Sequence, residues 1–239
     1  MNLTLKPEFG LNGSAMKVIA MISMVIDHVA LYLMEHGTVL YGTMRCIGRI
    51  AFPVFAFLIA EGFIHTRSRY RYFFTLLGFA VISEIPWYLL NGADGTHNVM
   101  FTLALGVATL MVLENLLQRS MVLGFLWTLG MAGLASWLGV DYEWRGILVI
   151  VISYLYNTYA HFFPYSRGMQ FFCTFTLTMH YGVIGAVMAC MFLYLYNGKR
   201  GFVQGSIAKY GFYAFYPAHF ILFIQICERS FPCILMFKL

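Results

Sequence analysis

Ionisable side chains lie inside the apolar stretches of this chain, where burying a charge is costly. Asp27 and His28 are adjacent in the apolar run from Ala15 to Met34, and Arg49 and Glu84 lie in the two runs that follow. An ionisable group in hydrocarbon costs at least about 2.5 kcal/mol and by default indicates a functional site. Because histidine takes up and releases a proton near neutral pH, these residue types suit acid–base catalysis or a proton relay.

Depth along the predicted helices brings these four groups together. At 1.5 Å per residue, His28 lies about 16 Å beyond Lys17, and Glu84 lies about 18 Å into its own run. The run that holds Arg49 enters from the outer surface, so we predict all four groups at a similar depth in the outer half of the membrane. Adjacent residues on a helix point about 100° apart, so we expect Asp27 to pair with Arg49 rather than to orient His28. The alternative is a buried ion-pair network that only fixes helix packing.

Further polar candidates lie near the ends of the apolar runs. Lys17 and His28 are eleven residues apart and share one helix face, so with Ser14 they form a polar stripe leading from the cytoplasm to mid-membrane. The ordinary alternative for Lys17 is a snorkelling lysine at a helix start. The remaining candidates are Arg45 one turn before Arg49, Glu61 near a cytoplasmic helix end, and Asn98 and Asp141 at the outer mouth.

The last apolar run contains a proline and a histidine among aromatic residues. Pro217 removes a backbone donor and predicts a kink near Phe212 to Tyr213. Tyr216 and His219 then lie near mid-membrane. A lone histidine in an aromatic run is usually a satisfied core residue, and we keep that alternative for His219.

The elements that must position these groups are transmembrane helices. The 239 residues are 61% hydrophobic and 10% charged, whereas soluble domains carry about 25% charged residues. We predict an all-α, polytopic transmembrane helix bundle, a single domain over residues 1–239, with about nine spans and eight as the alternative. The predicted runs are Ala15–Met34, Met44–Ile64, Tyr72–Leu90, Val99–Leu117, Met121–Val140, Gly146–Tyr159, Met169–Tyr196 and Tyr210–Ile226.

Loop charge orients the runs and decides between eight and nine. The three arginines after the second run, Arg67, Arg69 and Arg71, predict a cytoplasmic loop and hence a cytoplasmic N-terminus. Lys199 and Arg200 fall on the same side only if the run Met169–Tyr196 crosses twice, turning near His180-Tyr181-Gly182. The net charge of +5 therefore follows the positive-inside rule, and we expect no nucleic-acid partner.

Familiar soluble catalytic motifs are absent from the sequence. It contains no GxSxG, HExxH, Walker loop or dinucleotide fingerprint. The seven histidines lack metal-ligand spacing. We expect no metal and no redox cofactor.

Several sequence blocks, in order, resemble the TraX family over nearly the whole chain. They are KVIAMISMVIDH (Lys17 to His28), IGRIAFPVFAFLIAEGFIHT (Ile47 to Thr66), Ser83-Glu84-Ile85-Pro86, Asn98-Val99, Tyr196 to Gly201, and FYAFYPAH (Phe212 to His219). Between Arg119 and Gln170 only Asp141-Tyr142 matches. The family is named for a conjugation protein that acetylates the N-terminus of pilin, and it resembles the integral membrane acyltransferases that include the heparan-glucosaminide acetyltransferases.

The resemblance implies an acyltransferase that takes acetyl-CoA from the cytoplasm and modifies an acceptor on the far side of a bacterial inner membrane. Members of the larger group use a membrane-embedded histidine, preceded in one branch by a basic residue at the spacing of Lys17 and His28. His28 would then be the general base, Arg49 would stabilise the oxyanion, and Asp27 and Glu84 would hold Arg49.

The resemblance also implies binding partners. Candidates to meet the phosphates of CoA are Lys17, Arg67, Arg69, Arg71, Lys199 and Arg200. The expected acceptor is a pilin-like peptide or a glycan. Two other functions remain open: a proton-coupled transporter, which the same buried groups would serve, and a non-catalytic scaffold of a secretion or pilus assembly.

Overall fold

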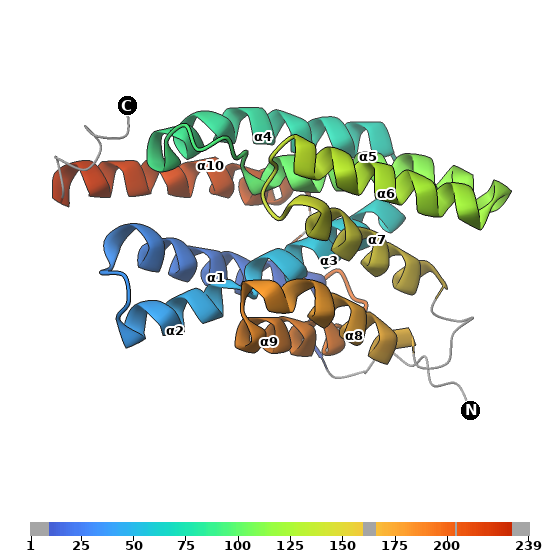
Figure 1. The fold of residues 1–239 in the computed structure, drawn as a ribbon, viewed down its shortest axis with the longest axis horizontal. Helices are drawn as coiled ribbons and strands as arrows, with labels where there is room; N and C mark the ends of the chain where they lie inside the picture. Colours follow the sequence, from blue (N-terminus) through green and yellow to red (C-terminus); the bar gives the residue numbers. More distant parts are fainter. Residues whose placement is uncertain (1–9, 160–165, 204, 231–239) are drawn as a thin grey trace. The chain divides into compact units, whose positions relative to one another are not determined.

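The structure is a computed structural model that describes residues 10–159, 166–203 and 205–230. Within these ranges the regular structure is helical, apart from isolated bridges (Figure 1). The helices are α1 (Gly13–Leu33), α2 (Val39–Gly48), α3 (Ala51–His65), α4 (Arg69–Asn91), α5 (Val99–Arg119), α6 (Met121–Trp137), α7 (Glu143–Tyr159), α8 (Ser166–Thr178), the 3₁₀ turn η1 (Met179–Tyr181), α9 (Val183–Tyr194) and α10 (Gly205–Ser230).

Capping residues determine where helices begin in the predicted apolar runs. Asn12 caps α1, since its side-chain oxygen accepts a hydrogen bond from the N–H of Ala15 at 2.9 Å. Ser68 caps α4 and Asn98 caps α5 in the same way. Side chains that satisfy the first N–H groups of a helix stabilise it by about 1 kcal/mol.

The long run Met169–Tyr196 is divided into two helices. Helix α8 ends at Thr178, η1 spans Met179–Tyr181, and α9 begins at Val183. Gly182, between them, has φ = 141°, a conformation that L side chains rarely adopt. The turn therefore lies where the sequence places it, at His180-Tyr181-Gly182.

The length and apolar composition of its helices identify the chain as a multi-pass membrane protein. In the described part, five segments are long and apolar enough to cross a bilayer: Gly13–Leu33, Val39–His65, Arg69–Asn91, Val99–Arg119 and Ile207–Arg229. Helices α6 and α9 are apolar but shorter. The all-helical architecture is confirmed; nine spans, like the single domain over residues 1–239, stay a prediction.

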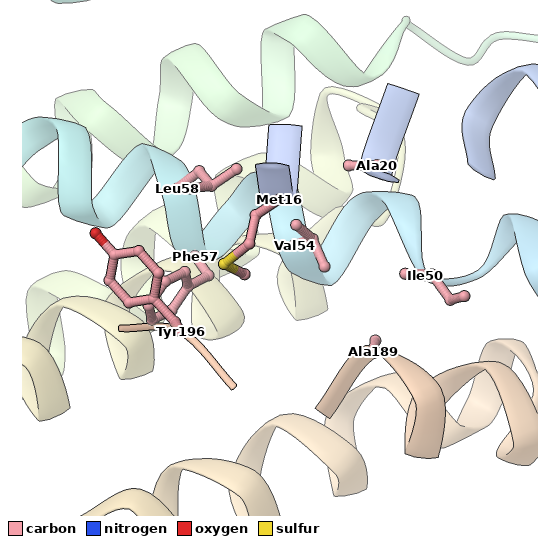
Figure 2. Close-up of a cluster of buried hydrophobic side chains, with 8 residues drawn as sticks. All are labelled: Met16, Ala20, Ile50, Val54, Phe57, Leu58, Ala189 and Tyr196. Carbon is pink, nitrogen blue, oxygen red and sulfur yellow. The ribbon is translucent and has the colours of Figure 1, made fainter. Parts of the chain in front are cut away.

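The described residues form two compact units. The first comprises residues 10–65 and 149–203, and the second comprises residues 66–148 and 205–230. In the first, α1 packs on α2 and α3, α3 packs on α9, and α8 packs on α9. Figure 2 shows part of its core, where Met16 of α1 lies beside Phe57 of α3 and Tyr196, whose ring meets that of Phe57 edge-on at 5.1 Å.

In the second unit α4 packs between α5 and α10, and α5 also packs on α6. Leu76 and Ala80 of α4 and Leu110 and Leu113 of α5 are buried there. The opposite face of α6 exposes large apolar side chains such as Phe125. Such a face suits contact with lipid.

Candidate functional site

Arg49 lies at a break in the second predicted run. Helix α2 ends at Gly48, α3 begins at Ala51, and Arg49 is the C-cap residue between them. Pro53 explains the break, because proline has no N–H to bond the carbonyl of residue 49 and its ring clashes with that carbonyl. The predicted run Met44–Ile64 therefore lies within the apolar segment Val39–His65, which is divided into two helices at this point.

The partly buried acid of α1, Asp27, pairs with Arg45. Nη1 of Arg45 donates to Oδ2 of Asp27 at 2.6 Å, and the two side chains are 20% and 15% exposed. Arg49, the partner predicted for Asp27, also acts on this carboxylate electrostatically. It follows Arg45 by one turn, and its N–H donates to the carbonyl of Arg45 at 3.2 Å.

Close packing around the ion pair fixes both helices. A Cβ on Gly48 would lie 2.1 Å from Oδ1 of Asp27, so only glycine lets α2 approach the carboxylate this closely. Gly185 at the start of α9 likewise abuts Arg49, since a Cβ there would lie 2.5 Å from the Cβ of Arg49. Ser23 donates to the carbonyl of Ile47 at 2.5 Å and adds a hydrogen bond between α1 and the end of α2.

His28 is buried in α1, at 9% exposure, directly after the acid of the ion pair. Its ring lies 5.7 Å from that of Tyr32, one turn further along. The first unit thus places a titratable imidazole and a compensated carboxylate in adjacent positions of one apolar helix. The catalytic roles of His28, Asp27 and Arg49 stay predictions.

Glu84 has its partners within the second unit. Nδ1 of His97 contacts Oε1 of Glu84, and Nδ2 of Asn98 donates to Oε2 at 2.6 Å. The blocks Ser83–Pro86 and Asn98-Val99 therefore meet through a carboxylate. The predicted grouping of Glu84 with Asp27 and His28 stays a prediction, since those residues belong to the first unit.

Asp141 belongs to the same end of the second unit. Its N–H donates to the carbonyl of His97 at 3.0 Å, and its own carbonyl accepts a hydrogen bond from the hydroxyl of Thr102. Tyr142 and Glu143, which follow, have φ of 63° and 44°. Left-handed backbone at two successive non-glycine residues is uncommon and strained.

A basic pocket of about 230 Å³ lies at the other end of the second unit. Its charged lining is Arg67, Arg71 and Lys209, and Nη2 of Arg71 lies 3.5 Å from the hydroxyl of Tyr210. Thr66, Ser68 and Tyr72 complete the lining, next to the N-terminus of α4. Arg69 does not line the pocket, because its guanidinium is paired with Glu114.

The segment Tyr196 to Val203 docks onto the start of α1. Gly13 and Ser14 donate their N–H groups to the carbonyls of Lys199 and Arg200 at 2.8 and 3.0 Å. The hydroxyl of Ser14 donates to the carbonyl of Arg200 and accepts from the N–H of Val203. The hydroxyl of Ser14 therefore holds this segment, and the polar stripe predicted with Lys17 and His28 stays a prediction.

Glu61 is buried in α3 and receives two polar neighbours. The hydroxyl of Tyr196 donates to Oε2 of Glu61 at 3.4 Å, and Nδ1 of His65 lies 3.5 Å from the same oxygen. Burial and the Glu61 carboxylate raise the pKa of Tyr196. This arrangement ties the end of α3 to the Tyr196 segment.

His219 has the surroundings of a core histidine. Its Nδ1 donates to the carbonyl of Phe215 at 3.1 Å, and its ring packs on those of Tyr216 and Phe220. Helix α10 continues unbroken through Pro217. Pro217 does not interrupt the helix, and the kink predicted near Phe212 to Tyr213 stays a prediction.

His97, Lys209 and Tyr210 are missing from the candidates chosen on sequence. The signal for His97 was weak but present, because it directly precedes Asn98 between two predicted runs. Lys209 lies beside Tyr210 at the start of the last run, on the side predicted to be cytoplasmic. Only packing of α10 on α4 brings these two residues to Arg71.

Apolar helices able to span a bilayer, with a partly buried carboxylate–guanidinium pair and a buried histidine, define a multi-pass helical membrane protein with titratable groups inside its spans. The chain belongs to the TraX family, whose family model, described as "TraX protein", matches residues 12–227.

Two curated relatives are similar to this chain. The probable fimbrial assembly protein FimC, serogroup H1, of Dichelobacter nodosus is 31% identical over 237 residues, covering 87% of this chain and 92% of the relative. An uncharacterised protein of Rickettsia prowazekii (strain Madrid E) is 31% identical over 167 residues, covering 69% of this chain and 62% of the relative. No solved structure matches the chain.

Proposed function

We propose that this protein is a membrane acyltransferase that moves an acetyl group from cytoplasmic acetyl-CoA to an amine or hydroxyl on the extracytoplasmic side of a bacterial inner membrane. The observation that carries the proposal is the burial of His28 in an apolar helix beside an acid that Arg45 already compensates. A neutralised ion pair needs only an arginine and an acid, and the imidazole beside it adds a group of the type that titrates near neutral pH. A titratable group placed at that cost is suited to moving a proton during a reaction.

In the proposed reaction His28 acts as general base. It takes the proton from the acceptor as the acceptor's nitrogen or oxygen attacks the thioester carbonyl, and the proton passes to the leaving CoA thiolate. One bond forms to the acetyl carbon and the carbon–sulfur bond breaks. Arg49 is proposed to stabilise the developing oxyanion, while the charge of Asp27 is balanced by Arg45.

The basic pocket of the second unit is proposed to bind phosphates of acetyl-CoA. Arg67, Arg71 and Lys209 supply three cations there, and the N-terminus of α4 adds the positive end of the helix dipole. The contacts of Lys17, Lys199 and Arg200 with these phosphates stay predictions from the sequence. Arg69 is proposed to hold α4 to α5 instead, because Glu114 neutralises it.

The relative named as a fimbrial assembly protein supports an acceptor in a surface fibre, such as a pilin-like peptide. A glycan is the other proposed acceptor. A non-catalytic scaffold of a fimbrial assembly would be equally consistent with this relative, but it would not need His28 for its function.

Purified protein in lipid nanodiscs tests the proposal. Wild type, H28Q and the control H36Q, in an exposed loop after α1, are incubated with acetyl-CoA, and release of the CoA thiol is followed. We expect release by wild type and H36Q, and a loss of about 10²-fold or more in H28Q at unchanged melting temperature. Equal release by H28Q and wild type contradicts the role of His28, and no release by wild type favours the scaffold.

Binding of acetyl-CoA tests the pocket separately. R71Q and K209Q should each raise the Kd roughly tenfold, the size expected for one partly screened charge-assisted contact. R119Q removes an exposed cation of the same unit that does not line the pocket, and should leave the Kd unchanged. Equal Kd values for all variants would place acetyl-CoA elsewhere.

A further inference from the structure

A histidine that no role above uses is held by a carboxylate at one end of the second unit. Glu84 of α4 accepts from Nδ1 of His97 through Oε1 and from Nδ2 of Asn98 through Oε2. Asn98 is fully buried, donates also to the carbonyl of Ala80 at 2.9 Å, and caps α5 through the N–H of Met100. Asn98 therefore fixes the carboxylate, and the carboxylate fixes the imidazole.

The backbone of His97 is anchored as well. Its N–H donates to the carbonyl of Gly139 at 2.9 Å, and its carbonyl accepts from the N–H of Asp141 at 3.0 Å. The imidazole is still accessible, since the side chain is 48% exposed. An accessible ring on a backbone held at two points is positioned to meet a ligand from outside.

The pairing also determines which ring nitrogen carries the proton. A carboxylate can only accept hydrogen bonds, so Nδ1 of His97 must donate to Glu84. In the neutral ring Nε2 is then left with its lone pair, and none of the described residues forms a hydrogen bond with it. A carboxylate that orients an imidazole in this tautomer is the arrangement found for general bases.

The two ends of the second unit carry opposite charges. The pocket end has Arg67, Arg71 and Lys209. At the other end the acids Glu84, Asp94, Asp141 and Glu143 outnumber the arginine Arg145. About 20 Å of helix α4 separates the two ends, at 1.5 Å for each residue from Arg71 to Glu84. An anionic substrate is favoured at the first end and a cationic one at the second.

We propose that His97, oriented by Glu84, is a second catalytic base, which receives the proton of an acceptor that arrives as an ammonium ion. The inference rests on the proposed function. An amino group with a pKa near 8 is mostly protonated at neutral pH and cannot attack a thioester in that form. The R–NH₃⁺ group gives one proton to Nε2 of His97, which passes it to water, and leaves R–NH₂ with its lone pair. The amine loses its second proton as it attacks the thioester carbonyl, and that proton passes to the leaving CoA thiolate.

The test uses the whole protein in nanodiscs with acetyl-CoA and two amine probes, a hexapeptide with a free N-terminus and glucosamine. We expect H97A to lower kcat for amine acetylation by about 10²-fold, the usual contribution of a general base, with the Kd for acetyl-CoA unchanged. Added imidazole should restore H97A at least in part, which a purely structural role would not allow. E84Q should lower kcat by a smaller factor because it keeps the shape but loses the orienting charge.

The comparison variant D94N removes a charge at the same end but retains the side-chain oxygen that accepts from Thr96; it should raise the KM for the amine and leave kcat at the wild-type value. Acetylation by H97A at the wild-type rate overturns the inference. The inference is also overturned if H97A loses amine acetylation, added imidazole does not restore it, and the melting temperature of H97A is lowered as well. Wild type that hydrolyses acetyl-CoA but acetylates neither amine overturns the inference alone, whereas no thioester turnover by wild type overturns the proposed function.

Discussion

Replacing Gly48 by alanine tests the packing that holds the buried ion pair. The new Cβ would lie 2.1 Å from Oδ1 and 2.3 Å from Cβ of Asp27, whereas ordinary contact begins at 3.4 Å. Either α1 must move away from α2 by about 1 Å, or Asp27 must change rotamer and lose Arg45. Overpacking of this kind costs roughly 1–3 kcal/mol.

Gly42 in the same helix provides a matched control. A Cβ there meets nothing within 4 Å, so G42A gains only the helix propensity of alanine over glycine, about 1 kcal/mol. G48A gains the same propensity and pays the steric cost in addition. The difference between the two variants therefore isolates the contact with Asp27.

The measurement is the melting temperature of both variants in the same detergent. For a chain of this size, a difference of 2 kcal/mol corresponds to about 4–8 °C. We expect G48A to melt below G42A by this amount. Equal melting temperatures would contradict the close approach of α2 to Asp27.

Three further variants test contacts in the first unit. R45Q should lower the free energy of unfolding by less than the 3–5 kcal/mol lost when a fully buried ion pair is broken, because the Arg45 side chain is 20% exposed. In a double-mutant cycle measured by thermal unfolding, adding D27N to R45Q should recover part of this loss. Y196F loses a hydrogen bond to the buried Glu61 carboxylate, which is worth about 1 kcal/mol. Burial raises the pKa of this tyrosine, so wild type should melt above Y196F by the full amount below about pH 10. This difference in melting temperature should shrink as the pH rises further. S14A removes two hydrogen bonds that hold the Tyr196 segment and should speed trypsin cleavage at the exposed Arg200, while cleavage at the wild-type rate would show that the segment is held by other contacts.

The helices are largely predictable from the sequence because lipid demands continuous apolar runs with satisfied backbone groups. The turn at Gly182 follows from a glycine placed between two such runs. The break at Arg49 has a local cause in Pro53, four residues on, and reading that proline as a helix breaker would have predicted it. These features depend on neighbours in the chain.

Partners that depend on packing between distant segments are not predictable in this way. Arg45 and Arg49 are one turn apart, and the sequence predicted Arg49 as the partner of Asp27, whereas the packing of α2 on α1 brings Arg45 into contact with this carboxylate. The basic pocket joins Arg71 to Lys209 across more than a hundred residues and requires α10 to pack on α4.

Transfer of the acetyl group across a membrane tests the central claim most directly. Proteoliposomes containing wild type, H28Q or the control H36Q would enclose glucosamine and the free-amine hexapeptide, with radiolabelled acetyl-CoA added outside. We predict labelled product inside vesicles with wild type and H36Q, and none above background with H28Q. Equal accumulation of luminal product with H28Q and wild type would contradict the account.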